Sequence, residues 1–270
     1  MPDPLAQAIH YSLTGEGKRM RGLLLLAAYE AADGSRIEDA AALAAAVEVV
    51  HAYSLVHDDL PCMDDDSMRR GRPTTHKAFG VAHATIGGVT MVPLAVRQTI
   101  VGARRLRLDA ETTKGLVRAL MRASGASGMV GGQLLDLEGE STQLPLDQLE
   151  RVHLGKTGSL IGASCAMGGM AAGGSDAQVK ALHSAGLALG LAFQIADDVL
   201  DATGSSETLG KTAGLDAARA KSTYASVLGV EQARRRRDGL VAEAMSSLDA
   251  AGLRTPIIDN LAHFVAERRS

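Results

Sequence analysis

Apolar residues recur at helical spacing along almost the whole chain, and glycine-rich or charged segments separate the periodic stretches. The stretch at 35–57 begins with Ser35 and has Glu38 three residues later, which is the pattern of a capping box. It is apolar on nearly all sides, so we expect it in the middle of a helical bundle. In chain order the period predicts helices at residues 5–13, 23–32, 35–57, 82–106, 110–128, 131–138, 146–157, 158–173, 176–201, 222–229, 231–251 and 256–269.

Composition supports the same fold class. Hydrophobic residues make up 46% of the 270 residues and only 7 are proline, while alanine and leucine dominate the periodic stretches. A chain of this length can bury a large core, and no linker divides it. We therefore expect one domain over residues 1–270, built as an all-α bundle.

Charge and aromatic content argue against a nucleic-acid partner. The net charge is -3 and the calculated pI is near 6.2, so there is no general basic field. Aromatic residues are 3% of the chain, with no Trp, which leaves few platforms for stacking bases. The four arginines at 234–237 are consecutive and would spread around a helix, so we interpret them as a solvated surface.

Polar residues within the apolar stretches bear on cellular location. Glu48, His51 and Gln194 interrupt the longest apolar runs, which favours buried core helices over membrane spans. Cys62 and Cys165 are far apart and form neither a disulfide framework nor a CxxC site. The first residues lack a basic segment followed by an apolar run, so no secretory signal is expected. These features predict a protein of the reducing cytoplasm, without stable membrane insertion.

Two of the apolar stretches end in grouped carboxylates. One is followed by Asp58 and Asp59, and the other by Asp197, Asp198 and Asp201. Because a helix C-terminus carries about half a negative charge, carboxylates there are repelled by the helix as well as by one another. Hard oxygen ligands of this kind suit Mg2+, which binds a few carboxylates together with substrate phosphates. The sequence therefore predicts a metal and phosphate site between two helix ends.

Cations from several parts of the chain accompany these acids. The segment at 60–77 reads as a loop dense in both signs of charge. Together with the acids, the cations indicate a diphosphate held partly through metal and partly by charge-assisted hydrogen bonds. A substrate with a diphosphate head and an apolar tail would use both the charged mouth and the apolar interior. The candidate cations are Lys18, Arg21, Arg69, Arg70, Lys156, Lys211 and Lys221.

His51 stands out because of its spacing. A lone histidine on an apolar helix is usually a core residue, but His51 lies seven residues before Asp58. Seven residues are about two helical turns, which places both side chains on one face. The spacing favours a substrate contact.

These segments resemble the motifs of the trans-isoprenyl diphosphate synthases. Residues 57–66, HDDLPCMDDD, with 69–76, RRGRPTTH, resemble the first aspartate-rich motif, and residues 193–201, FQIADDVLD, resemble the second. The resemblance covers the chain from about residue 8 onward. Shorter matches in the same order are Gly17-Lys18-Arg19-Met20-Arg21, Gly132-Gln133 with Asp136, Lys156-Thr157-Gly158, Gly210-Lys211 and Lys221-Ser222-Thr223-Tyr224.

The resemblance implies a bundle of mostly antiparallel helices around a central cavity, usually homodimeric. It implies condensation of isopentenyl diphosphate with an allylic diphosphate such as dimethylallyl or geranyl diphosphate. The implied cofactor is Mg2+, with two ions at the first motif and one at the second. The implied ligands are Asp58, Asp59, Asp64, Asp197, Asp198 and Asp201.

Further roles follow from the resemblance, residue by residue. The resemblance implies that Asp58, Asp59 and Asp197 are catalytic. It also implies that departure of the diphosphate is assisted by Arg69, Lys156, Lys211 and Lys221. Thr157 and Gln194 are implied to lie near the allylic carbocation. The residues implied to hold isopentenyl diphosphate are Lys18, Arg21, His51 and Arg70.

Product length depends on the floor of the cavity. Tyr53 and Ser54 lie five and four residues before Asp58, or about 6 to 8 Å deeper along the helix. This aromatic position, with the insertion Pro61-Cys62, resembles the bacterial farnesyl diphosphate synthases within the family. We expect farnesyl diphosphate as product, with geranyl or geranylgeranyl diphosphate as alternatives. A tyrosine on a buried helix could equally be ordinary core.

Four positions depart from the family pattern. Gly22 stands where proline is common, Ser67 where another acid is common, Val81 where glutamate is usual, and Val89 where aspartate is usual. None removes an implied metal ligand, although Val89 is expected to disturb a local polar network. A first helix that often contributes to dimerisation is also expected to be missing. Weaker activity or an altered partner stays open.

Two other classes of protein compete with this interpretation. A class I terpene cyclase also uses an aspartate motif with Mg2+, but its cavity would be lined by aromatics, which are few here. A non-catalytic subunit of a heteromeric synthase, of low activity, would normally lack one of the acidic motifs. Both motifs are present in this chain.

Overall fold

The protein is described here from a computed structural model, which describes residues 3–140, 142–204 and 221–267. It is mostly helical, which confirms the all-α prediction. The strands are β1 (Met68–Arg69) and β2 (Arg72–Pro73). The helices are α1 (Asp3–Leu13), α2 (Met20–Ala31), α3 (Ile37–Asp58), α4 (Thr75–Phe79), α5 (Val81–Leu106), α6 (Ala110–Ser124), α7 (Met129–Glu138), α8 (Leu146–His153), the π-helical turn η1 (Leu154–Gly158), α9 (Ser159–Ala172), α10 (Asp176–Thr203), α13 (Tyr224–Leu228), α14 (Val230–Ala250) and α15 (Pro256–Ala266).

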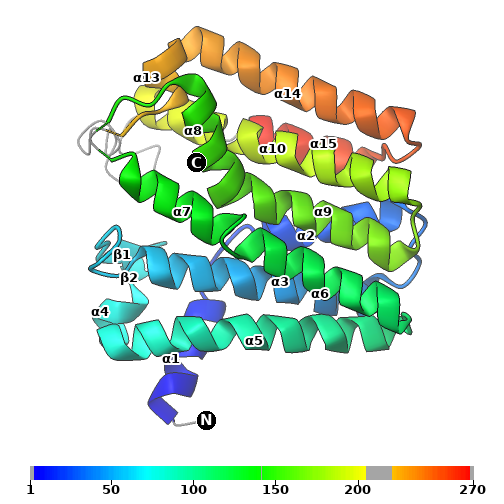
Figure 1. Cartoon of the computed structure of the whole chain (residues 1–270), viewed down its shortest axis with the longest axis horizontal. Coiled ribbons are helices and arrows are strands. Elements are labelled where there is room, and N and C mark those ends of the chain that lie inside the picture. The colour runs from blue at the N-terminus through cyan, green and yellow to red at the C-terminus, as the bar shows by residue number, and fades with distance from the viewer. Residues whose placement is uncertain (1–2, 141, 205–220, 268–270) are drawn as a thin grey trace.

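The long helices lie side by side in a layered bundle (Figure 1). Helix α3 packs on α5 and α2, while α9 packs on α2, α6 and α10, and α14 covers α10. Buried residues occur on all sides of α3 between Ala40 and Val56, as its pattern predicts. One buried cluster surrounds α3 and a second surrounds α10, where Leu189 and Ile195 are almost inaccessible.

Three helices, α3, α5 and α10, are long and apolar enough to cross a membrane by length and composition alone. Within their most apolar windows, 56% of residues are buried in α3 and 50% in α10, but 39% in α5. Of these three helices, α5 thus has the smallest share of buried residues, and its exposed apolar residues include Val81, Ile86 and Val89. Absence of membrane insertion stays a prediction.

The start of α3 differs from the expected capping box. The helix begins at Ile37, and its N-cap residue is Arg36, which makes no capping side-chain hydrogen bond. Arg36 is held instead by tertiary contacts, because its N–H donates to the Tyr29 hydroxyl at 3.3 Å and its guanidinium to the Arg105 carbonyl at 2.8 Å. The capping role predicted for Ser35 is therefore wrong.

Two short features were not predicted. The segment at 60–77 contains an antiparallel pair in which Met68 lies opposite Pro73 and Arg69 opposite Arg72, followed by α4. The helix expected at 146–157 ends at His153, and the chain continues as η1. Isolated π-turns of this kind are frequent at functional sites.

Candidate active site

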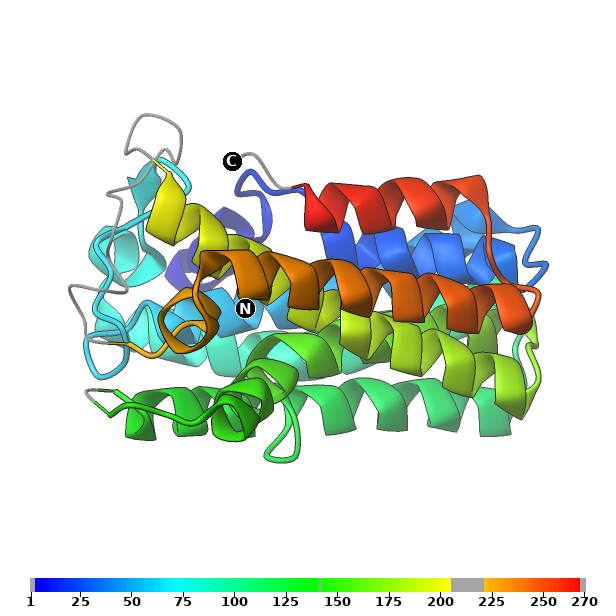
Figure 2. The same ribbon diagram turned by 90° about the horizontal axis from the view of Figure 1, so that it is seen from above.

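The two acidic groups lie at the same end of the bundle. Helices α3 and α10 both run toward the end that carries β1 and β2, as both views show (Figures 1 and 2). Helix α3 ends at Asp58, and the acids of α10 lie within its last two turns. Helix α9 packs on both. The structure thus brings together the two carboxylate groups singled out in the sequence.

The carboxylates of the first group have different surroundings. Asp59 is only 3% exposed and accepts hydrogen bonds from Arg69, through Nε at 2.9 Å and also through Nη2. Burial raises the pKa of Asp59, although Arg69 opposes this. Burial raises the pKa of Asp58 to about 6, outweighing the attraction of Lys156. An added positive charge near Asp58 would therefore favour its ionised form.

A second cluster joins the predicted lysines through an acid with no assigned role. Asp136 on α7 accepts hydrogen bonds from Lys156 Nζ at 2.7 Å and from Lys221 Nζ at 3.2 Å. Lys221 also lies 3.3 Å from Glu140 and 3.9 Å from Asp64. Although burial acts in the opposite direction, the two lysines hold the pKa of Asp136 below its usual value. This cluster links α7 and η1 to the first acidic motif.

Glycines allow α7 to reach η1. A Cβ added at Gly155 would lie 2.8 Å from the Gly132 Cα, and a Cβ added at Gly132 would overlap the backbone of η1. Contact between backbones is therefore possible only because both residues lack side chains. It places Gln133 and Asp136 beside Lys156. Both polar atoms of the buried Gln133 amide lack a hydrogen-bond partner within the described residues.

Residues predicted near a carbocation form a connected chain. Thr157 donates to Gln194 Oε1 at 3.3 Å, and Gln194 Nε2 donates to Asp198 Oδ1 at 3.2 Å. The other oxygen of Asp198 accepts the Tyr224 backbone N–H at 2.8 Å. Asp198 is 4% exposed, so in this geometry both of its oxygens face protein donors. This arrangement orients Gln194, and Asp197 on the same turn is half-buried.

The predicted isopentenyl diphosphate residues meet beside α3. Burial lowers the pKa of Arg21 to about 10, while the charges of Glu48 and Asp197 raise it and that of Arg70 lowers it further. Burial, followed by Arg21 and Arg70, holds the pKa of His51 well below its usual value, so its ring is neutral at pH 7. Charged side chains from α2, α3, α10 and the β1–β2 hairpin (residues 68–73) are therefore close enough to shift one another's pKa.

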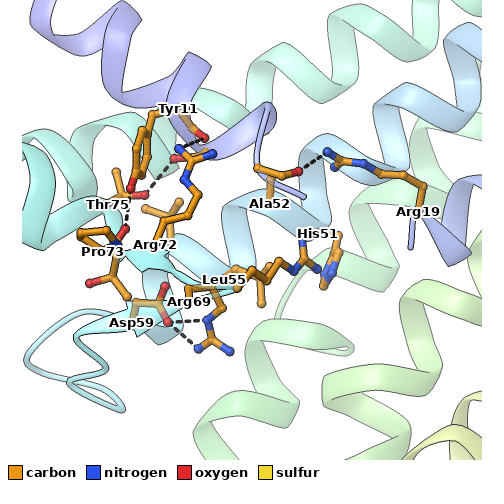
Figure 3. A pocket seen from close by; sticks show the side chains of 15 residues that line it. Tyr11, Arg19, His51, Ala52, Leu55, Asp59, Arg69, Arg72, Pro73 and Thr75 are labelled. Carbon is orange, nitrogen blue, oxygen red and sulfur yellow. Dashed lines mark hydrogen bonds and ion pairs between the residues drawn. The ribbon is translucent and has the colours of Figure 1, made fainter. Parts of the chain in front are cut away.

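A pocket opens between α3 and the hairpin (Figure 3). It encloses about 530 Å³, including the solvent at its mouth, and His51, Arg69 and Arg70 are among its lining residues. Arg70 adopts a left-handed φ of 53° and donates to the Glu16 carbonyl at 2.6 Å. Lys18 lies with its ammonium 5.2 Å from the centre of the Phe264 ring. Arg21, His51 and Arg70 therefore lie close enough for their charges to act on one another, whereas the Lys18 ammonium lies against α15.

Tyr53 and Ser54, the predicted floor of the cavity, lie about one helical turn before Asp58 on α3. The Tyr53 ring contacts the His57 ring edge-on, with the ring centres 4.7 Å apart. Ser54 donates to the His51 carbonyl at 2.9 Å. Both side chains are half-buried. Lys211 lies outside the described residues.

Several site residues were missed in the sequence. Asp136 and Gln133 belong to a motif that was noted without a role, and Glu48 was treated only as an interruption of an apolar run. A charged residue inside a buried helix needs a partner, and this signal could have singled out Glu48. Arg19 donates to the carbonyls of Leu13 and Gly15, at 3.1 and 2.6 Å.

The donor chemistry fits Mg2+. Among the described residues, no group of three or more His, Cys, Asp or Glu side chains gathers tightly enough to hold a metal ion by itself. The predicted carboxylates lie at the same end of the bundle (Figure 1), and Mg2+ needs only one or two carboxylates per site when it also binds substrate phosphates. The raised pKa of Asp58 is consistent with such a cation.

Comparisons with known proteins agree with this geometry. The chain matches the polyprenyl synthetase family over residues 2–251. It is 39% identical to the farnesyl diphosphate synthase of Bacillus subtilis, covering 99% of this chain and 90% of that protein. It is 43% identical to the enzyme of the same name from Micrococcus luteus, and the match covers 95% of this chain and 86% of that protein.

Relatives named for a longer product, geranylgeranyl diphosphate, have about the same sequence identity to this chain. Geranylgeranyl pyrophosphate synthase 6 of Arabidopsis thaliana is 41% identical and covers 98% of this chain and 80% of its own length. The crystal structure of a Helicobacter pylori geranyltransferase complexed with magnesium and isoprenyl diphosphate superposes with a TM-score of 0.83, at 34% identity, covering 97% and 87%. This chain belongs to the polyprenyl synthetase family, which uses Mg2+, and is a prenyltransferase, a short-chain prenyl diphosphate synthase.

Proposed function

We propose that this synthase condenses isopentenyl diphosphate with dimethylallyl and geranyl diphosphate and releases farnesyl diphosphate. The observation that carries the product assignment is Tyr53, half-buried on α3 one turn from Asp58 and braced edge-on by His57. An aromatic ring at that depth would stop a growing prenyl chain. Because relatives named for farnesyl and geranylgeranyl products have similar identities, overall similarity does not decide between them.

The acidic end of the bundle would bind the allylic diphosphate. Mg2+, when bound, would neutralise the diphosphate and make it a better leaving group. We assign the ions, two at the first motif and one at the second, to Asp58, Asp59, Asp64, Asp197 and Asp201, with Asp198 acting mainly through Gln194.

The neighbouring side chains have separate tasks. Arg69, Lys156 and Lys221 would supply charge-assisted hydrogen bonds to the departing group. Thr157 of η1 and Gln194 of α10 turn oxygen atoms toward one another, where they would face positive charge on the prenyl carbon. The apolar helices around them would exclude water from that cation.

Isopentenyl diphosphate would occupy the basic region beside α3. Lys18, Arg21 and Arg70 provide positive charge, and the neutral His51 ring can donate or accept a hydrogen bond without adding repulsion. Ionised Asp197 is close enough to raise the pKa of Arg21, so this region adjoins the second acidic motif. Adjacent subsites are what condensation of two diphosphates requires.

Product analysis tests the assignment. The purified protein is incubated with Mg2+, isopentenyl diphosphate and geranyl diphosphate, and the products are sized by chromatography. Tyr53→Ala should extend the products beyond farnesyl diphosphate, whereas Tyr53→Phe should leave them unchanged. Geranylgeranyl diphosphate as the main product of the unaltered protein would refute the farnesyl assignment, and an unchanged product in Tyr53→Ala would refute the role of Tyr53.

We further propose a cytoplasmic homodimer. The exposed apolar side chains of Ile86 and Val89 on α5, and of Leu134 on α7, support burial against a second copy. Cys62 and Cys165 are both free thiols, consistent with a reducing compartment. Light scattering after size exclusion would test the dimer, since a monomer at micromolar concentration contradicts it. Fractionation of cells would test the location.

A further inference from the structure

The basic region begins at a helix start that lacks a cap of its own. Arg19 is the N-cap residue of α2, with a left-handed φ of 50° and no capping side-chain hydrogen bond. The first N–H groups of a helix have no partner within that helix and need an acceptor elsewhere. Lys18 and Arg21 flank this start, so its orientation sets theirs.

The missing acceptor comes from another helix. Gly22, the third residue of α2, donates its N–H to Glu48 Oε1 on α3 at 2.9 Å. The second carboxylate oxygen of Glu48 lies 3.9 Å from Arg19 Nη1, and its side chain is 13% exposed. A carboxylate at this position also complements the positive end of the α2 dipole. Glu48 therefore caps α2 from the neighbouring helix.

Glu48 also balances the charge of Arg21. Burial lowers the pKa of Arg21, and the charge of Glu48 is the largest influence that raises it again. On α3, Glu48 lies about one turn before His51, so both face the same region. One carboxylate thus acts on Arg19, Gly22 and Arg21.

Gly22 makes this contact possible in two ways. A Cβ at residue 22 would lie 3.3 Å from the Glu48 Cγ and 3.4 Å from the Ala44 Cβ, so the two helices are already close. Proline at this position would have no N–H to donate. In this chain the glycine supplies the hydrogen bond.

We propose that Glu48 is a positioning residue for isopentenyl diphosphate, which caps α2 through the Gly22 N–H and thereby holds Lys18 and Arg21 opposite His51 and Arg70. The inference rests on the proposed binding of isopentenyl diphosphate in this region. It assigns Glu48 no contact with the substrate. Its effect is expected in affinity for one substrate and not in the rate of ionisation of the other.

Variants of Glu48 give the first test. In Glu48→Ala the KM for isopentenyl diphosphate should rise about tenfold, equivalent to ~1.4 kcal/mol, while kcat and the KM for geranyl diphosphate stay within about twofold. Glu48→Gln retains an acceptor for the Gly22 N–H and should show a smaller rise. Glu38→Ala, an exposed acid at the start of the same helix, is the control and should match the unaltered protein.

A matched pair at Gly22 separates the hydrogen bond from crowding. Gly22→Ala and Gly22→Pro both place a carbon near Glu48, but only proline removes the N–H, and the first turn of a helix accepts proline. Gly22→Pro should therefore raise the KM for isopentenyl diphosphate more than Gly22→Ala. Combining Gly22→Pro with Glu48→Ala should add little, because both changes remove one contact.

Calorimetric binding of isopentenyl diphosphate, without the allylic substrate, provides a readout independent of turnover, and circular dichroism confirms folding. If the unaltered protein binds isopentenyl diphosphate but Glu48→Ala and Gly22→Pro bind it equally well, the role of Glu48 is overturned and the proposed function stands. An equal rise in both KM values would overturn it as well. If the unaltered protein neither binds isopentenyl diphosphate nor extends geranyl diphosphate, the proposed function fails first.

Discussion

Replacing Asp136 with Asn tests whether the lysine cluster is part of the active site. The Asp136 carboxylate on α7 is the shared acceptor of Lys156 and Lys221, at 2.7 and 3.2 Å. Asparagine has nearly the same shape but no charge, so both ammonium groups would lose an ionic partner while the packing is kept. The expected result is a lower kcat with geranyl diphosphate.

The size of the effect follows from burial and from the partners that remain. A hydrogen bond to a charged group contributes about 1.5–3 kcal/mol when shielded from water. Lys156 and Lys221 are 26% and 15% exposed, which reduces that value through screening. Lys221 keeps Glu140 at 3.3 Å, so the main loss falls on Lys156. We expect a net effect of about 1–2 kcal/mol, or roughly tenfold in kcat.

Steady-state rates of product formation from geranyl and isopentenyl diphosphate, with each substrate varied in turn, measure this effect. Glu138→Gln removes an exposed acid from the same helix and should leave both kcat and KM unchanged. A parallel thermal melt checks that Asp136→Asn still folds. If the folded variant keeps the kcat of the unaltered protein, the cluster does not orient Lys156 for leaving-group departure.

Three further perturbations test other contacts. Burial lowers the pKa of His153 to about 4, so the free energy of unfolding should be highest above about pH 6.5 and should fall by up to about 3 kcal/mol as the pH drops toward 4. Urea unfolding at pH 7 and 4.5 should show that His153→Phe, which keeps a ring against Tyr224, removes this loss. Phe264→Leu removes the ring below Lys18 and should raise the KM for isopentenyl diphosphate about threefold, with Phe264→Tyr as control, since an exposed cation–π contact contributes about 0.5–1 kcal/mol; an unchanged KM contradicts this contact. Gly132→Ala should push α7 away from η1 and lower both melting temperature and kcat, and retention of both values would contradict the tight backbone contact.

The helices and the acidic ends could be predicted from the sequence because both follow from local pattern. Helix α3 is apolar on all sides and stops at its carboxylates, so hydrophobic period and charge locate it within one or two residues. The boundary error at Ser35 has a tertiary cause, since Tyr29 and Arg105 hold Arg36 from other helices. Local capping preferences cannot register such contacts.

The pairing of the site residues could not be predicted in the same way. Asp136 meets Lys156 across 20 residues and Lys221 across 85, and no periodicity connects them. The resemblance singled out both lysines, but only the fold shows which acid they share. Similarly, only the fold shows that Asp198, a predicted metal ligand, accepts hydrogen bonds from Gln194 and from the Tyr224 backbone.

The π-turn η1 also fixes the relative rotation of the helices on either side of it. Helices α8 and α9 follow one another with no break, but η1 accommodates one more residue per turn than an α-helix would. Each residue in an α-helix advances the side chains by about 100°. If the same residues wound as a regular α-helix, everything before η1 would turn by about that angle relative to α9, whereas deleting one residue there would restore a regular helix with little rotation. The orientation of α8 relative to α9 therefore depends on the π-helical winding of this turn.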